Sequence, residues 1–315
     1  MTRVAIVGTG FWGAKLAEAV GRSSLELAAC FSRDDDRRAA FAERFGCEAA
    51  PSYEAALDAA DAVVLATPND EHEAQTLEAA RRGKHVFVEK PIAMTVAAAE
   101  RMRDGCRDAG VALLVGHELR RLGAARRTKA VLDSGALGTV VLAEANFSLA
   151  SPVRPGTWKE GRGTPLVQLG VHHADTLQYL LGPVVRTTGR LNRVVSDVDI
   201  DDTGAAILEF QSGAIGTIGS SYVSPKTYSI RLLGTEAVLD YRTDISVWPA
   251  ADRLDSMTTL TVGGEVAAFE HVDPLVDELE ELARCARGEA TPETGADEGI
   301  AALRVIIEAT QSGRT

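Results

Sequence analysis

The stretch VAIVGTGFWGAKLAEAV, residues 4–20, contains the pattern that decides the fold of this chain. An apolar run ends in glycines spaced as GxGxxG, and a helical pattern begins directly after them. The first glycine of such a turn allows a tight bend, the second lets a pyrophosphate approach the backbone, and the third brings the helix close to the strand. The N-terminus of that helix offers unpaired N–H groups and the positive end of its dipole to phosphate groups.

We therefore predict that this stretch is a strand, a turn and a helix that together bind a dinucleotide. The alternative is a glycine turn with a structural role alone. It is less favoured, because the motif opens the chain, follows a strand pattern and starts a strand-helix-strand unit. The predicted contacts to the dinucleotide are Gly8, Thr9, Gly10, Phe11, Trp12 and Gly13.

Short apolar runs alternate with helical patterns over the first 120 residues. The runs predicted as strands are residues 3–7, 27–31, 62–66, 85–88 and 112–115, and the helices between them are residues 15–20, 36–45, 71–82 and 96–109. Strands that alternate with helices at this interval are typical of a doubly wound parallel sheet. The strands are nearly continuous in apolar residues, as a sheet covered on both faces requires. We therefore predict an α/β fold for this half.

A different pattern follows after about residue 120. Strand-like runs, several of which alternate apolar with polar residues, occupy residues 139–149, 204–210, 214–222, 228–233 and 237–241. Residues 211–213 form a short hairpin connection, and helical patterns begin at Pro274 and at residue 299. We predict an α+β domain with a large, mostly antiparallel sheet and helices on one face. Because 315 residues exceed the usual size of one hydrophobic core, we predict two domains, residues 1–120 and 121–315, and the last helix can pack back on the first domain.

The composition limits the partners of the chain. Its formal net charge is −12, whereas nucleic-acid binding requires clustered Lys and Arg, so we expect a small-molecule ligand and no nucleic acid. The four cysteines lack the spacing of a zinc site or a disulfide framework, which favours a reducing compartment and no metal. No signal peptide and no apolar run of about 20 residues is visible, so we expect a cytoplasmic protein that does not associate with a membrane.

The end of the second predicted strand bears on the choice of dinucleotide. A carboxylate at this position binds the ribose hydroxyls of NAD, whereas a nearby arginine accommodates the 2′-phosphate of NADP. Ser32 and Arg33 therefore favour NADP. The acidic run at residues 34–36 leaves NAD open, because one of these carboxylates could reach the ribose instead of starting the next helix.

The stretch GKHVFVEKPI, residues 83–92, places Lys90 directly after a buried strand, which stops at Pro91. Ligands of doubly wound sheets bind at the carboxyl ends of the strands. We therefore predict that Lys90 points into the nicotinamide pocket and stabilises an oxygen that becomes alkoxide-like, rather than being a surface lysine at a turn. The bond before Pro91 can also be cis. By the same logic, further predicted cofactor contacts are Thr67, Pro68, Asn69, His72, Glu89, Lys90 and Pro91, with a structural role for His72 as an equal alternative.

Residues 165–183, PLVQLGVHHADTLQYLLGP, carry the second group of polar side chains. On a helix Gln168, His172 and Asp175 share one face. Histidine suits proton transfer from an alcohol, because its unperturbed pKa lies near neutrality. Adjacent residues point in different directions on a helix, so we predict that at most one of the pair His172 and His173 faces the substrate. These residues lack the spacing of metal ligands.

Taken together, VAIVGTGFWG, ATPNDEHEAQTLEAARRGKHVFVEKP and GVHHADTLQYLLG resemble the glucose-fructose oxidoreductase, inositol dehydrogenase and rhizopine-catabolism family, Gfo/Idh/MocA, over essentially the whole chain. The resemblance implies a Rossmann domain, and a substrate domain whose open antiparallel sheet commonly forms homodimers or homotetramers. It implies that Lys90 lies near the reacting carbon and that His172 accepts the hydroxyl proton. The family commonly has Asp four residues before this histidine, where the chain has Gln168. Predicted substrate contacts are Lys90, His117, Arg154, Trp158, Gln168, His172 and Asp175, with Lys159 and Arg162 in the same loop. The spacing of the four loop residues fits a solvated loop equally well.

The resemblance implies an NAD(P)-dependent dehydrogenase that acts on a CH–OH group of a sugar, cyclitol or sugar derivative, and Ser32 and Arg33 favour NADP over NAD as its cofactor. Two alternatives stay open. A tightly bound cofactor can oxidise the substrate transiently, for isomerisation or redox-assisted glycoside cleavage. A regulator can bind the cofactor without turnover, for which Gln168 is the only hint, because an amide cannot hold a proton as a carboxylate can.

Overall fold

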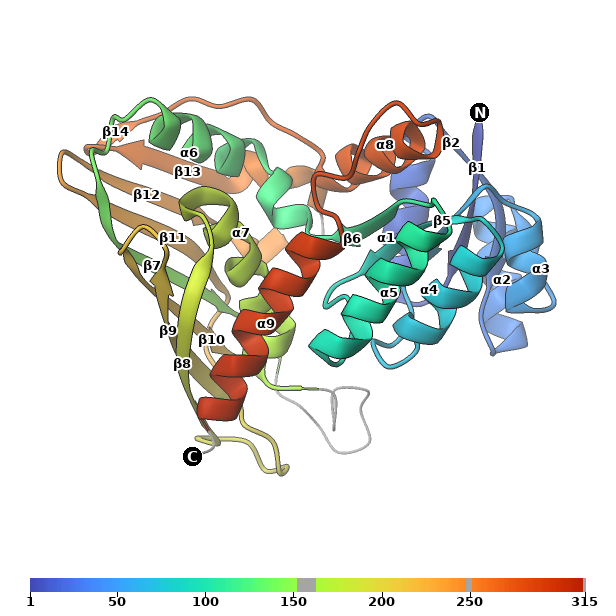
Figure 1. The fold of residues 1–315 in the computed structure, drawn as a ribbon, viewed down its shortest axis with the longest axis horizontal. Helices are drawn as coiled ribbons and strands as arrows, with labels where there is room; N and C mark the ends of the chain where they lie inside the picture. The colour runs from blue at the N-terminus through green and yellow to red at the C-terminus, as the bar shows by residue number, and fades with distance from the viewer. Residues whose placement is uncertain (152–162, 248–250, 314–315) are drawn as a thin grey trace. The chain divides into compact units, whose positions relative to one another are not determined.

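The structure is a computed structural model that describes residues 1–151, 163–247 and 251–313 (Figure 1). Contacts divide the chain into two compact units. The first unit contains residues 1–118 and 275–300, and the second contains residues 119–274 and 301–315. In the part of the chain that is described, no helix is both long enough and apolar enough to cross a bilayer.

The first unit is built on a six-stranded parallel sheet in the order β3-β2-β1-β4-β5-β6. Its strands are β1 (Thr2–Val7), β2 (Leu25–Phe31), β3 (Glu48–Ala49), β4 (Ala62–Leu65), β5 (His85–Glu89) and β6 (Leu113–Gly116). The helices between them are α1 (Phe11–Val20), α2 (Asp35–Phe45), α3 (Tyr53–Asp58), α4 (His72–Arg81) and α5 (Val96–Asp108). Ile6, Val64 and Phe87 are fully buried, as in a sheet that is covered on both faces. The predicted doubly wound sheet is confirmed.

Residues 275–300 contain α8 (Pro274–Ala286) apart from its first residue, and the start of α9 (Ala296–Ser312). They group with the first unit, whereas the sequence predicts a boundary near residue 120 and a last helix that can pack back on the first domain. The difference has a physical cause in the contacts of this segment. The Val115 N–H donates to the Thr294 carbonyl at 2.8 Å, and the Ser24 hydroxyl donates to Glu280 at 2.7 Å.

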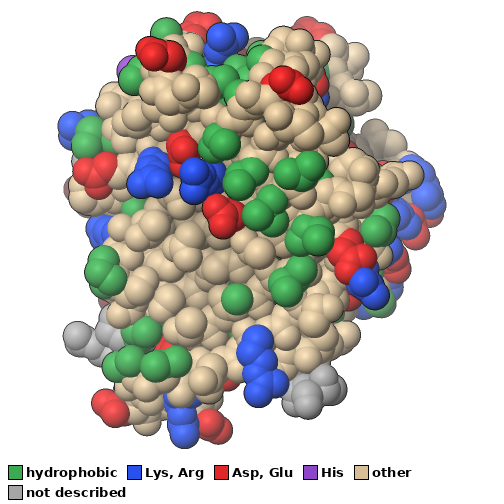
Figure 2. Space-filling model, turned by 90° about the vertical axis from the view of Figure 1, so that its left-hand side faces the viewer, with side chains coloured by type: hydrophobic (Ala, Val, Ile, Leu, Met, Phe, Trp, Pro, Cys, Tyr) green, Lys and Arg blue, Asp and Glu red, His purple; other side chains and the backbone are tan. Residues whose placement is uncertain are grey.

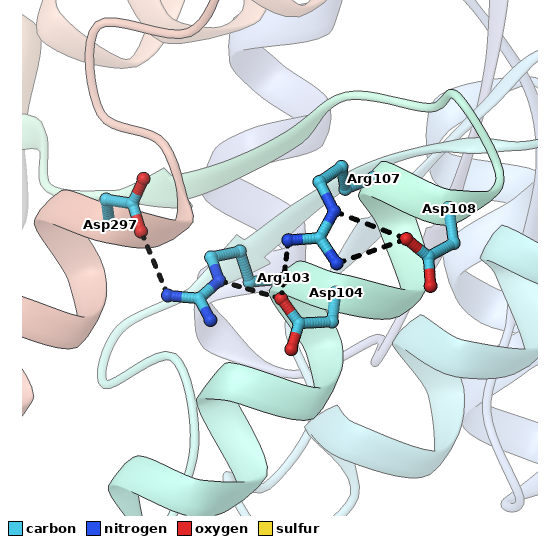
Figure 3. A network of polar contacts seen from close by, with 5 residues as sticks. All are labelled: Arg103, Asp104, Arg107, Asp108 and Asp297. Carbon is cyan, nitrogen blue, oxygen red and sulfur yellow. Dashed lines mark hydrogen bonds and ion pairs between the residues drawn. The ribbon is translucent and has the colours of Figure 1, made fainter.

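A chain of ion pairs also links the first turn of α9 to α5 (Figure 3). Arg103 donates to Asp104 at 3.0 Å and to Asp297 at 3.3 Å. Arg107 lies 3.1 Å from Asp104 and 3.2 Å from Asp108. All five side chains are at least about a third exposed, so solvent and salt screen each pair and it contributes little to stability.

The second unit is built on an eight-stranded sheet in the order β14-β13-β12-β11-β7-β10-β9-β8. Its strands are β7 (Val140–Ser148), β8 (Val184–Asn192), β9 (Thr203–Phe210), β10 (Ile215–Ser221), β11 (Thr227–Gly234), β12 (Val238–Thr243), β13 (Thr258–Val262) and β14 (Glu265–Val266). Strands β7 and β10 pair in parallel and the other neighbours pair antiparallel, which confirms the predicted sheet. Helices α6 (Gly123–Asp133) and α7 (Val171–Leu181) pack against one face of this sheet (Figure 1).

The opposite face of this sheet carries a shallow hollow of about 400 Å³. Figure 2 shows the side of the molecule where this face lies, with hydrophobic side chains spread between basic and acidic ones. Charged residues of both signs line the hollow: Glu144, Arg231, Asp240 and Arg242. Large apolar side chains on the same sheet are about half exposed, at 53% for Ile207 and 47% for Ile215.

Candidate active site

The glycine turn after β1 has the geometry that a dinucleotide site requires. Gly8 has a φ of +98°, a conformation that L side chains rarely adopt, and a Cβ there would lie 2.4 Å from the Ala66 carbonyl oxygen. A Cβ on Gly13 would lie 1.9 Å from the Gly8 carbonyl oxygen. A Cβ on Gly10 would meet nothing within 4 Å. Gly8 and Gly13 therefore serve close packing, and the backbone at Gly10 is open to a ligand.

The N-terminus of α1 fits a pyrophosphate. Gly10 is its N-cap residue and supplies no side chain to cap the first turn, which also contains no acidic residue. The first N–H groups of a helix need acceptors from outside the helix, and its dipole attracts an anion to this end. The residues present thus match the phosphate-binding role that the sequence predicts for this turn.

The end of β2 collects hydroxyl and guanidinium groups. Thr9 donates its hydroxyl to Ser32 at 3.0 Å, which joins the glycine turn to the end of β2. Arg38, on α2, donates to the Ser32 carbonyl at 2.9 Å. Arg33 pairs with Glu71 at 3.1 Å, and 78% of its side chain is exposed.

Arg38 is a residue that the sequence analysis missed. Its side chain is only 16% exposed, and its guanidinium carbon lies 5.9 Å from the centroid of the Phe31 ring. The signal in the sequence was an arginine one turn into the helix that follows Ser32. Arg33 and Arg37 are equally plausible candidates in the sequence, and only the fold shows which arginine returns to the end of β2.

His72 lies between the two turns that follow β4 and β5. Its Nε2 is 3.1 Å from the carbonyl oxygen of Thr67, and its Nδ1 is 3.2 Å from the carbonyl oxygens of both Pro91 and Ile92. The ring is fully buried, and this burial lowers the pKa of His72 below its usual value. The structure thus gives His72 a role in joining the turns, and its predicted contact with the cofactor stays a prediction.

Lys90 follows β5 and is half-buried, and the bond between Lys90 and Pro91 is cis. The neighbouring Glu89 is buried, and its carboxylate accepts from the Lys90 N–H at 3.3 Å. Burial raises the pKa of Glu89 to about 7, against the opposing effect of the Lys90 ammonium.

His117, which follows β6 at the same edge of the sheet, is 1% exposed. Thr67, Pro68 and Asn69 are half-buried after β4. The strand ends therefore place these predicted residues along one edge.

In the second unit, the segment that carries His172 begins with an unexpected turn. Leu166–Gly170 is a π-helix, and α7 continues from Val171. The face that the sequence analysis gives to Gln168, His172 and Asp175 assumes a regular helix, whereas Gln168 lies in this π-helical turn. The turn packs on the sheet, because a Cβ on Gly170 would lie 3.4 Å from both Ile218 and Ser220. Short π-helical turns occur frequently at functional sites.

The adjacent histidines of α7 are both buried. His172 is 2% exposed, and its ring centroid lies 5.5 Å from that of Phe147 on β7. His173 is fully buried and lies 4.7 Å from the ring centroid of Tyr228 on β11. Burial lowers the pKa of His173 to about 4, so its ring is neutral at physiological pH. His173 is therefore part of the core. Gln168, which lies one turn before His172, is half-buried.

Asp175 is paired with an arginine that the sequence analysis also missed. Arg120, on the 3-10 helix η1 (Glu118–Arg121), donates from Nε to Asp175 Oδ2 at 2.7 Å and from Nη2 to Asp175 Oδ1. The side chains of Arg120 and Asp175 are 5% and 1% exposed.

The predicted substrate contacts Arg154 and Trp158, and their neighbours Lys159 and Arg162, lie outside the described residues. No cluster of metal-ligating side chains occurs in the described ranges.

The class of protein follows from these two sites. A doubly wound sheet with an open glycine turn, followed in the chain by a large antiparallel sheet, is the architecture of a nicotinamide-dependent oxidoreductase. Residues 2–117 match an oxidoreductase family with an NAD-binding Rossmann fold, and residues 125–240 match the Gfo/Idh/MocA C-terminal domain. The chain belongs to the Gfo/Idh/MocA family, and it is an NAD(P)-dependent dehydrogenase.

Relatives of known name support this assignment over the full length. The chain is 31% identical to D-xylose 1-dehydrogenase (NADP⁺) 2 of Haloferax volcanii, over 98% of this chain and 97% of the relative. It is 26% identical to scyllo-inositol 2-dehydrogenase (NAD⁺) of Bacillus subtilis, over 81% and 75%. A crystal structure from Desulfitobacterium hafniense, provisionally described as an NADPH-dependent oxidoreductase, shares 34% identity with a TM-score of 0.93, over 99% and 95%.

Proposed function

We propose that this dehydrogenase transfers a hydride between nicotinamide and a secondary alcohol or ketone carbon of a sugar, cyclitol or sugar derivative. The observation that carries the proposal is the edge of the parallel sheet. There Lys90 follows β5, two strands along the sheet from the open glycine turn after β1. The similarity to xylose and inositol dehydrogenases supports a polyhydroxylated substrate.

In this proposal Lys90 and His172 divide the work on the substrate hydroxyl. The Lys90 ammonium hydrogen-bonds the oxygen and stabilises the negative charge that develops on it. His172 accepts the hydroxyl proton as the carbon is oxidised and returns it in the reverse direction. A bound nicotinamide accepts or donates the hydride, and the chain supplies orientation and charge. Gln168 can bind a substrate hydroxyl through its amide.

We also propose NADP as the preferred cofactor. Arg38 supports this choice, because its guanidinium is held against the Ser32 carbonyl at the end of β2, where the second phosphate of NADP binds in this fold. Arg33 is a second candidate, because its exposed guanidinium could release Glu71 and bind the phosphate instead. NAD remains compatible with the same turn.

The test is the absorbance of reduced nicotinamide when the purified protein receives NADP or NAD with a panel of aldoses, ketoses and cyclitols. We expect one group of polyols to give a steady rate with NADP. Arg38→Ala should raise KM for NADP about tenfold to a hundredfold, the range of one charge-assisted hydrogen bond, and leave KM for NAD nearly unchanged.

Arg44→Ala is the matched control for this experiment, because Arg44 lies at the far end of the same helix and pairs with Glu18 at 2.7 Å. A loss of both cofactors in Arg38→Ala would contradict the phosphate role. Cofactor that copurifies and does not exchange, with no net reduction, would favour transient oxidation. Cofactor binding with no reaction on any substrate would favour the regulator.

We propose further that the open face of the eight-stranded sheet binds the same face of a second copy, to give a homodimer or homotetramer. Half-exposed apolar residues beside charges of both signs form a patch that can complement itself across a two-fold axis. A cytoplasmic location is part of the proposal, and the four cysteines, all free thiols, support a reducing compartment.

Reversing the charge at Arg231 tests the association. Arg231 lies 3.5 Å from Asp240 beside the hollow, so Arg231→Glu would place two carboxylates together on each copy. We expect sedimentation velocity to show a shift from oligomer toward monomer. Arg107→Glu, on α5 of the first unit, should leave the mass unchanged. A wild-type protein that sediments as a monomer would contradict the proposal directly.

A further inference from the structure

Asp175, which forms an ion pair with Arg120, lies close in the chain to the proposed base His172. Asp175 follows His172 by three positions on α7, so the two side chains are neighbours on the helix surface. Two hydrogen bonds join the guanidinium to the carboxylate, and neither residue is more than 5% exposed. The Arg120 guanidinium also lies 5.2 Å from the centroid of the Tyr179 ring, one turn further along α7.

This arrangement changes the interpretation of Asp175. A carboxylate bound bidentately by a buried guanidinium carries no net charge as a pair. Position 168, on the other side of His172, holds an amide and cannot supply a charge either. The immediate neighbours of His172 along its helix are thus neutral overall, although one of them is an aspartate.

We propose that Arg120 and Asp175 are positioning residues for His172, which hold its helix in place and keep the charge beside its imidazole balanced. Asp175 then acts through His172 and not as a ligand of the substrate. Within the pair, Arg120 cancels the carboxylate charge that would otherwise favour the protonated imidazole. The inference deepens the proposed function, because it gives the base a neutral setting in which it can accept a proton.

Other ionisable groups lie on α7 and on the elements around it, and they are the same in every variant used in the test below. They are His173 and Tyr179 on α7, Glu118 and Arg121 on η1, Arg126, Arg127, Lys129 and Asp133 on α6, Glu144 on β7, and Tyr228 on β11. Glu144 lines the hollow on the open face of the sheet, and His173 is neutral at physiological pH. None of them is altered in the variants, so differences between variants report on the pair.

The test is an NMR titration of the His172 ring in the full chain without substrate, with the resonance assigned by its absence in His172→Asn. Asp175→Asn keeps the shape of the side chain but leaves a guanidinium unbalanced, so the titration midpoint should fall by about one pH unit. Arg120→Gln leaves the carboxylate unbalanced and should raise the midpoint. The double variant has neither charge and should return close to the wild-type midpoint.

A merely structural pair would not give shifts of opposite sign that cancel in the double variant. Arg186→Gln is the matched control, because Arg186 forms an exposed pair with Glu209 in the same unit and should cause no shift. If Asp175→Asn leaves the midpoint unchanged, or if the double variant keeps the shift, the proposal is wrong. Should Arg120→Gln fail to fold, Asp175→Asn and the double variant decide alone. The titration needs no turnover, so its outcome is independent of whether His172 proves to be the base.

Discussion

Lys90→Met should reduce kcat about 10²- to 10³-fold while the protein still binds its cofactor. Methionine keeps the length and most of the apolar stem of lysine but removes the charge that the proposed mechanism places on the substrate oxygen. The fold should tolerate the change. The ammonium lowers the pKa of the buried Glu89, so its loss raises that pKa above about 7 and leaves a neutral carboxyl instead of an unpaired charge.

Stopped-flow absorbance of reduced nicotinamide measures the rate, and calorimetric titration measures cofactor binding in the same preparations. Lys84→Met is the matched control, because Lys84 precedes the same strand and donates to the Ala60 carbonyl at 2.8 Å, away from the carboxyl edge. Near-normal turnover in Lys90→Met would remove the lysine from the mechanism, and loss of cofactor binding would mean that its role is to hold the nicotinamide.

His172→Asn should lower the rate of alcohol oxidation about 10²- to 10⁴-fold, the usual contribution of a positioned general base. Asparagine occupies a similar volume and can hydrogen-bond the substrate, but it cannot accept the proton. The acidic limb of the pH-rate profile should vanish with the imidazole. Steady-state rates from pH 5 to 9 measure both effects, and a profile whose acidic limb survives in the variant would assign that limb to another group.

His173→Phe distinguishes the roles of the two histidines. This variant should keep near wild-type activity and change the pH dependence of the free energy of unfolding instead. The native state holds His173 neutral down to about pH 4, whereas the unfolded chain binds a proton near pH 6.5. Its contribution to stability is therefore complete above about pH 6.5 and is lost as the pH falls toward 4, by about 3 kcal/mol. Denaturant unfolding at several pH values should show this slope in the wild type and not in His173→Phe.

The sequence predicted most of the first unit because its signals are local. The strands β1, β2, β4 and β5 end within one residue of their predicted ends, where apolar runs meet Gly, Ser, Thr and Glu. Two short elements, β3 and α3, were missed because two and six residues are too few to show a period. Helix α3 is nevertheless capped, since Ser52 accepts from the Ala55 N–H at 3.1 Å.

Helix α6 was missed for a different reason. No residue of its own segment caps it, and Asp255 accepts from the N–H groups of Gly123 and Ala124 across more than 130 residues of sequence. The partners Arg38 and Arg120 were missed for the same reason, since each acts through a contact that only the folded chain creates. Candidate residues that stand in sequence motifs could be predicted, and the contact partners that the fold brings to them could not.

The buried ring of His72 has a consequence for how this enzyme tolerates change. One imidazole faces the carbonyl of Thr67 on one side and those of Pro91 and Ile92 on the other. A displacement of either turn is therefore transmitted to the other, and substitutions in the two turns should show non-additive effects. A substitution that displaces the Thr67 turn should therefore also disturb the turn that carries Lys90 and Pro91.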